Sequence, residues 1–123
     1  MLKVIVMLKK RQGMSDADFR KHYEEIHAPL GLSLMPRARR YRRKFLTSTG
    51  SKSSPIVDDA FDVVTEAWFA SREDYDATIR EMQGKRAALD TDEFNLFDRP
   101  ATRYYVVAAE SESAIAGSED LKD

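Results

Sequence analysis

The sequence predicts an α+β fold of the ferredoxin-like type, in which two helices cover one face of a four-stranded antiparallel sheet. Three observations lead to this prediction. Alternating apolar and β-branched residues mark four strand-like segments, and apolar residues at helical spacing mark two longer helices. Their order along the chain is strand, helix, strand, strand, helix, strand. Right-handed crossovers then place both helices on the same side of one sheet.

Length and composition set the broad class of the protein. The chain has 123 residues, and one domain is expected to occupy residues 1–110. Residues 111–123 are acidic and nearly lack large apolar side chains, which predicts a disordered tail. The 20 basic and 21 acidic side chains nearly balance, so no nucleic-acid or membrane partner is expected. No cysteine is present, which excludes disulfides and thiolate chemistry, and no secretion signal is recognisable, which favours a cytoplasmic protein.

Four segments have the pattern of strands. Residues 2–9 and 61–69 carry apolar side chains on both alternating faces, which is typical of central strands. Residues 38–47 are rich in arginine and are expected at an edge of the sheet. Residues 101–110 are expected to form the fourth strand. The small polar residues at 48–60 predict a mobile connection between the second and third strands.

Two helices are expected after the first and third strands. Ser15 can cap a helix over residues 16–27, which should end there because Pro29 disfavours helical geometry at the residue before it. A second helix begins after Ser71, which is placed to cap it. Residues 84–100 indicate a shorter, broken helical region that Pro100 ends.

The helices cover only one face of the predicted sheet, although the central strands are apolar on both. Ile5 and Met7 of the first strand point to the uncovered side. An apolar sheet face is not left in contact with water, so a second copy of the chain is the natural cover. The sequence therefore predicts a homodimer.

Two stretches, KVIVMLKKRQGMSDADFRKHYEEIHAPL and FDVVTEAWFASREDY, resemble the EthD family of small dimeric α/β-barrel proteins. Their most specific parts are HAPL at the end of the first helix and EAWFAS after the third strand, and the resemblance extends over about residues 2 to 107. It implies two ferredoxin-like subunits whose sheets close into an α/β barrel, each with a pocket between sheet and helices. It also implies that the histidine before Ala-Pro, His27, acts in catalysis. Relatives include proteins linked to ether degradation, polyketide decarboxylases and lactone isomerases.

His22 and His27 are the two histidines of the chain, five residues apart on the first helix. The apolar stripe of this helix consists of Phe19, Tyr23, Ile26 and Leu30. On a regular α-helix the two histidines lie at opposite borders of the stripe and diverge, so a shared metal site is not expected. In the plainer interpretation, His27 only caps the end of the helix and His22 lies on its surface.

Tyr23 stands four residues before His27, so a phenol and an imidazole can lie together against the sheet. The imidazole can exchange a proton near neutral pH, and the phenol can donate a hydrogen bond to an oxyanion. Isomerisation and decarboxylation need both tasks. The pair is therefore a candidate catalytic site.

Glu66 is a third candidate acid or base, because it shares a strand face with Val64 and Trp68, where loss of water raises the pKa of a carboxyl group. Alternatively, it pairs with an arginine of the second strand. Five aromatic residues either line an apolar substrate pocket or only pack the core: Trp68, Tyr75, Phe94, Phe97 and Tyr104.

The segment RARRYRRK, Arg37 to Lys44, contains six basic residues in eight. Charges on an edge strand discourage uncontrolled pairing with other chains, and arginines also bind the carboxylate of an acidic substrate. Nucleic-acid binding is disfavoured, because no partner motif or net basic charge accompanies the segment.

These features predict a homodimeric enzyme that isomerises or decarboxylates a small apolar, oxygenated ring compound, such as a lactone or a polyketide or aromatic acid. No phosphate-binding loop, nucleophile motif or metal-ligand spacing is present, so no cofactor is expected. Two alternatives remain. One is a non-catalytic protein that binds a hydrophobic metabolite for a degradation pathway, and the other is a heme-binding or monooxygenase-type member of the same superfamily.

Overall fold

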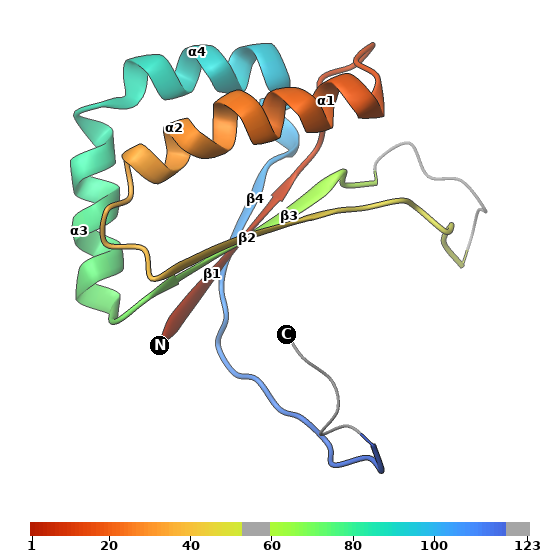
Figure 1. Ribbon diagram of the computed structural model, residues 1–123, viewed down its shortest axis with the longest axis vertical. Coiled ribbons are helices and arrows are strands. Elements are labelled where there is room, and N and C mark those ends of the chain that lie inside the picture. Colours follow the sequence, from red (N-terminus) through yellow and green to blue (C-terminus); the bar gives the residue numbers. More distant parts are fainter. Residues whose placement is uncertain (53–59, 118–123) are drawn as a thin grey trace.

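The computed structural model describes residues 1–52 and 60–117. Within these ranges it contains the predicted antiparallel sheet of four strands, with helices on one face (Figure 1). The strands are β1 (Leu2–Leu8), β2 (Arg40–Phe45), β3 (Val63–Phe69) and β4 (Arg103–Val106). Their order across the sheet is β2-β3-β1-β4. The ferredoxin-like α+β fold is thus confirmed, with β1 and β3 central and β2 at an edge.

Two of the expected irregular segments lie partly outside the described residues. These are the connection at 48–60, of which 53–59 are not described, and the tail at 111–123, of which 118–123 are not described. No helix in the described ranges combines the length and the apolar character needed to cross a membrane.

The first helical segment is longer than predicted. It comprises α1 (Asp16–His22), a π-helical turn η1 (Tyr23–His27) and α2 (Ala28–Ser33), which follow one another without a break (Figure 1). Ser15 caps it as expected, because its Oγ accepts a hydrogen bond from the Asp18 N–H at 3.1 Å. The predicted end at residue 27 is wrong. Pro29 lies in the first turn of α2, directly after the π turn, and does not end the helical segment.

Two further helices pack against the same face of the sheet. They are α3 (Arg72–Gln83), capped by Ser71, and α4 (Arg86–Leu96), which a short 3₁₀ turn η2 (Arg99–Ala101) follows. The predicted helical region before Pro100 contains α4, which is continuous over 11 residues, so the region is interrupted only at Phe97 and Asp98, between α4 and η2. The buried residues of α4 are Leu89, Asp92 and Leu96. Because the middle one is charged, the sequence does not show a regular spacing of apolar residues here.

The core lies between the sheet and the helices. Phe19, Tyr23 and Phe97 contact one another edge to face, with ring centroids 5.8 to 6.0 Å apart. Alternation along β3 places Val63, Thr65, Ala67 and Phe69 on the covered face, and Val64, Glu66 and Trp68 on the uncovered one. This division decides which candidate residues can meet.

Candidate functional site

A cavity of about 160 Å³ lies between the covered face of the sheet and the helices. Its wall is mostly apolar, with side chains that include Val4, Val6, Ala67, Phe69, Ile79, Met82 and Leu89. Five of the eight residues predicted from the sequence line it, namely Tyr23, His27, Tyr75, Phe97 and Tyr104. Glu66, Trp68 and Phe94 do not.

The π turn brings the two histidines together. The Ala28 N–H donates to the carbonyl of Tyr23, five residues earlier, so this turn holds one more residue than an α-helical turn. Residues five apart consequently lie on the same side, and the predicted divergence of His22 and His27 is wrong. The same change rotates Ile26 outward, where it is 51% exposed, and buries His27, which is 8% exposed.

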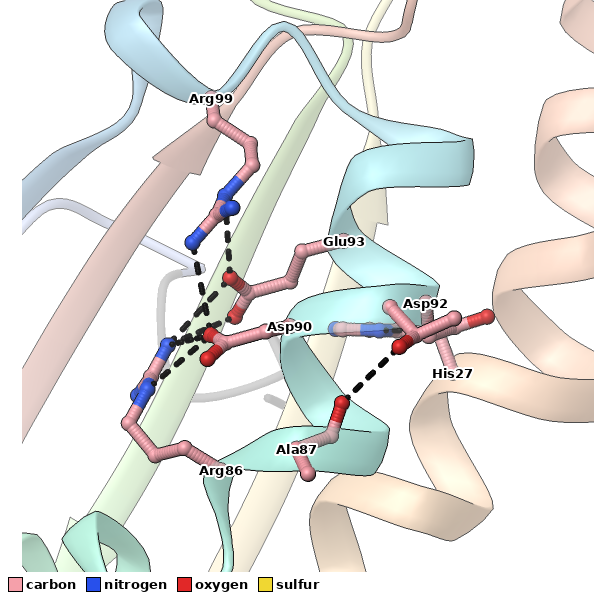
Figure 2. Close-up of polar contacts among 8 residues, drawn as sticks. His27, Arg86, Ala87, Asp90, Asp92, Glu93 and Arg99 are labelled. Carbon is pink, nitrogen blue, oxygen red and sulfur yellow. Dashed lines mark hydrogen bonds and ion pairs between the residues drawn. The ribbon is translucent and has the colours of Figure 1, made fainter.

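Both imidazoles meet the carboxylate of Asp92, which α4 supplies. Nδ1 of His27 lies 2.8 Å from Oδ2 of Asp92, and Nε2 of His22 lies 2.6 Å from Oδ1. Figure 2 shows Asp92 on the side of α4 that faces His27. Asp92 itself is buried, so its charge is compensated mainly by these two contacts.

The surroundings of His27 favour a neutral imidazole with a defined tautomer. Burial lowers its pKa below the ordinary 6.5, the hydrogen bond and charge of Asp92 oppose this only in part, and the charge of His22 lowers it further. Because Nδ1 faces a carboxylate, this nitrogen carries the hydrogen and Nε2 carries the lone pair. No residue in the described ranges hydrogen-bonds to Nε2 of His27. The imidazole therefore presents the features of a base at the wall of an apolar cavity.

Tyr23 lies beside His27, as the spacing of four predicted. The two ring centroids are 4.9 Å apart and the rings are steeply inclined. The Tyr23 hydroxyl is hydrogen-bonded to Oγ1 of Thr65 and interacts with the hydroxyl of Tyr41, and burial raises its pKa well above the usual range. Tyr23 thus stays protonated and can act only as a hydrogen-bond donor or acceptor.

Glu66 and Trp68 lie on the uncovered face of the sheet, away from His27. Glu66 stands opposite Arg42 in the register, yet its ion pairs are with Lys3 and Lys44, the latter at 2.9 Å. Burial acts to raise its pKa, but the two ammonium groups outweigh it and the pKa is lowered. Lys3 and Arg40 stack on the Trp68 ring, 4.9 and 5.1 Å from its centroid. These residues form a charged cluster separate from the cavity.

Phe94 and the basic segment also lie outside the cavity. Phe94 is 69% exposed on α4. In the basic segment, Arg37 pairs with Glu81 of α3 at 2.7 Å, and Arg43 pairs with Glu24 of the first helical segment at 2.6 Å. These pairs connect the edge strand β2 and the residues just before it to the helices.

Sequence reasoning missed Asp92 and the polar group at one side of the cavity. There, Arg86 bonds to Asp90 and approaches Glu93, and Arg99 bonds to Asp90 (Figure 2). Burial raises the pKa of Glu93, while the two arginines oppose the change. A carboxylate at helical spacing between two leucines was the available signal for Asp92, because a charge on an apolar stripe requires buried partners.

The described part of the chain contains no group of three or more histidine or acidic side chains that could hold a metal ion. His22, Asp92 and His27 form a hydrogen-bonded chain in which the carboxylate lies between the rings, and this is not a set of ligands that converge on one point.

Comparison with known proteins agrees with this architecture. The structure is similar to an ethyl tert-butyl ether D (EthD) family protein from Bacillus halodurans C-125, with a TM-score of 0.64, 20% identity, and coverage of 89% of this chain and 99% of that one. It is also similar to a dimeric protein of unknown function and ferredoxin-like fold from Bacteroides fragilis (TM-score 0.51, 15% identity, coverage 86% and 91%). A hydroxynitrile lyase from Passiflora edulis is similar as well (TM-score 0.51, 17% identity, coverage 90% and 96%).

At these identities the likenesses show the fold alone. No curated protein matches the sequence. The sequence itself is matched by the family model of the EthD domain over residues 11–100, which is most of the chain. We conclude that the chain belongs to the EthD family.

Proposed function

We propose that this protein is a cofactor-independent enzyme that transfers a proton on a small apolar, oxygenated ring compound, with His27 as the base. One observation carries the proposal. A buried imidazole lines an apolar cavity, a carboxylate binds its Nδ1, and its Nε2 has no partner in the described ranges. A base needs a neutral form with a free lone pair at the operating pH, and this arrangement supplies it.

The chemistry follows from the positions of the groups. Nε2 of His27 takes a proton from a carbon next to a carbonyl, and the electron pair of the broken C–H bond moves onto the carbonyl oxygen. The charge of Asp92 stabilises the imidazolium that results. The same imidazolium returns the proton to a different carbon in an isomerisation. In a decarboxylation, the C–C bond to the carboxylate breaks instead, carbon dioxide leaves, and the bonding electron pair moves onto the carbonyl oxygen. A His27 that has taken up a proton from solvent then supplies it to the carbon.

Hydroxyl groups on the cavity wall can stabilise the oxyanion. Tyr23 and Tyr41 both line the cavity, and burial raises the pKa of each, so both keep their hydrogens. Apart from the polar group of Arg86 and Glu93 at one side, the walls are mostly apolar, which favours a compact substrate with few oxygen atoms. Removal of a hydroxyl proton by the same nitrogen is the first step that a lyase acting on a hydroxynitrile needs, so lyase chemistry is included in the proposal.

The proposal extends to a homodimer formed through the uncovered sheet face. This face carries Ile5, Met7, Val64 and Trp68, which the helices of the same subunit do not cover. Tyr105 of β4 stands opposite Ile5 and is 54% exposed. A partner sheet would remove these side chains from water.

The cavity of about 160 Å³ is too small for a porphyrin, so heme binding is not proposed. Binding without turnover is the second candidate function, because the apolar wall alone suffices to hold a hydrophobic ligand.

A deuterium-exchange screen tests the proposal. The protein is incubated in D₂O with a panel of small lactones, β-keto acids and cyclic ketones, and deuterium incorporation is followed by NMR. We expect exchange with at least one compound, and its loss in His27→Gln. Glu25→Gln is the matched control, since this exposed side chain belongs to the same π turn. A compound that exchanges equally with wild type and His27→Gln would refute the role of His27, and binding without exchange would favour the second candidate.

A further inference from the structure

The carboxylate of Asp92 contacts two imidazoles that differ in solvent exposure. The His22 side chain is 25% exposed, whereas those of His27 and Asp92 are 10% and 8% exposed. His22 therefore exchanges protons with bulk water directly. His27 faces the cavity.

The geometry of the helix makes this sharing possible. A regular α-helix would direct His22 and His27 to different sides, and only the π turn at Tyr23–His27 turns both toward α4. His22 is not needed to orient His27, because Oδ2 of Asp92 alone accepts its Nδ1–H. The second contact, through Oδ1, requires a separate explanation.

We propose that His22 is a positioning residue that sets the basicity of His27 through the carboxylate of Asp92, which the two imidazoles share. The inference rests on the proposed function in so far as His27 is taken as the base. When His22 is protonated, it compensates the charge of Asp92, and a proton on His27 gains less from that charge. When His22 is neutral, the whole charge of Asp92 stabilises the His27 imidazolium.

Few other charges act on this group. In the described ranges, α4 presents Asp92 to both rings, and His22 is the further charge that acts on His27. The remaining neighbours of the His27 ring are the phenol of Tyr23, whose pKa burial raises, and the uncharged ring of Phe97, 4.9 Å away. Glu93, the next acid on α4, is paired with Arg86 and Arg99.

The consequence for catalysis is a wider working range. When His22 carries a proton, its charge keeps His27 neutral at pH values where a histidine beside an uncompensated carboxylate would already be protonated, so His27 retains its lone pair.

Histidine-selective NMR titration of the ligand-free protein tests the coupling. We expect the titration midpoint of His27 to rise by about one pH unit in His22→Gln, because the amide keeps a hydrogen bond to Asp92 but brings no charge. In His22→Lys, which is charged throughout, the midpoint should stay below that of His22→Gln. Thermodynamic linkage further requires that His27→Gln raise the midpoint of His22 by the same amount as His22→Gln raises that of His27.

Lys21→Gln is the matched control, since it removes a positive charge from the adjacent, exposed position. It should leave the His27 midpoint within about 0.2 pH units of wild type, because an exposed charge is screened. Equal midpoints in wild type, His22→Gln and His22→Lys would overturn the inference and reduce His22 to a structural contact. No substrate enters this experiment, so coupling without catalysis would refute the proposed function alone, and catalysis by His27 without coupling would refute this inference alone.

Discussion

Replacing Asp92 with alanine should cost the protein about 3 kcal/mol of unfolding free energy. Asp92 accepts one hydrogen bond from each imidazole, at 2.6 and 2.8 Å, and its side chain is 8% exposed. A hydrogen bond to a charged group contributes about 1.5 to 3 kcal/mol, and a buried donor left without a partner costs about 1 to 3 kcal/mol. Most of the loss should come from His27, which is buried. His22 can turn toward water, so its share should be small.

Urea unfolding at pH 7.5, followed by the fluorescence of Trp68, measures this change, and thermal unfolding should show a midpoint lower by about 10 °C. Asp90→Ala is the matched control. This acid lies two positions away on α4 in half-exposed ion pairs, and its loss should cost under about 1 kcal/mol. Asp92→Asn keeps the shape and one acceptor, and should fall between the two. An Asp92→Ala variant within about 0.5 kcal/mol of wild type would refute the view that this carboxylate holds the histidines.

Three other expected outcomes concern the burial of His27, the π turn and the uncovered face of the sheet. Because the pKa of His27 is lowered in the folded state, the unfolded state binds more protons below about pH 6.5, so the unfolding free energy should decrease as the pH is lowered through this range. Urea titrations of His27→Gln should show a smaller decrease, and equal slopes would contradict the burial effect. Ile26→Gln should change the unfolding free energy by under about 0.5 kcal/mol in the same assay, because the π turn exposes this residue. Phe19→Ala, in the buried core, should cost about 3 to 5 kcal/mol. A large loss of unfolding free energy in Ile26→Gln would argue for a regular helix. Light scattering at micromolar concentration should give twice the chain mass of 14.1 kDa, and a stable monomer would contradict a dimer formed through the uncovered face.

The fold was predictable because its signals are local. Two-residue alternation marked β1 and β3, serine caps marked the starts of two helices, and the order of elements restricted the topology to one common arrangement. Alternation also grouped Glu66 with Trp68 correctly. It could not tell which of the two strand faces the helices would cover, and for this reason Glu66 was assigned to a site from which the sheet separates it.

The site was predictable only in part, because its central contact is tertiary. The spacing of four residues identified Tyr23 beside His27, and the two rings do lie in contact. The convergence of His22 on Asp92 depends on a π turn, which a helical projection at 100° per residue does not represent. Asp92 is distant in sequence from both histidines, and no local pattern linked them.

The tautomer of His27 at neutral pH decides whether this residue can act as the base. Nitrogen-15 chemical shifts of histidine distinguish a ring nitrogen that carries hydrogen from one that carries a lone pair, and His27→Gln identifies the resonances. We expect a neutral ring at pH 7 with hydrogen on Nδ1, bound to Asp92, and a lone pair on Nε2. In Asp92→Asn the preference for this tautomer should weaken. A wild-type His27 that carries hydrogen on Nε2 at pH 7, either as the other tautomer or as an imidazolium, would lack the lone pair that a base requires, and this result would contradict the proposed role of His27.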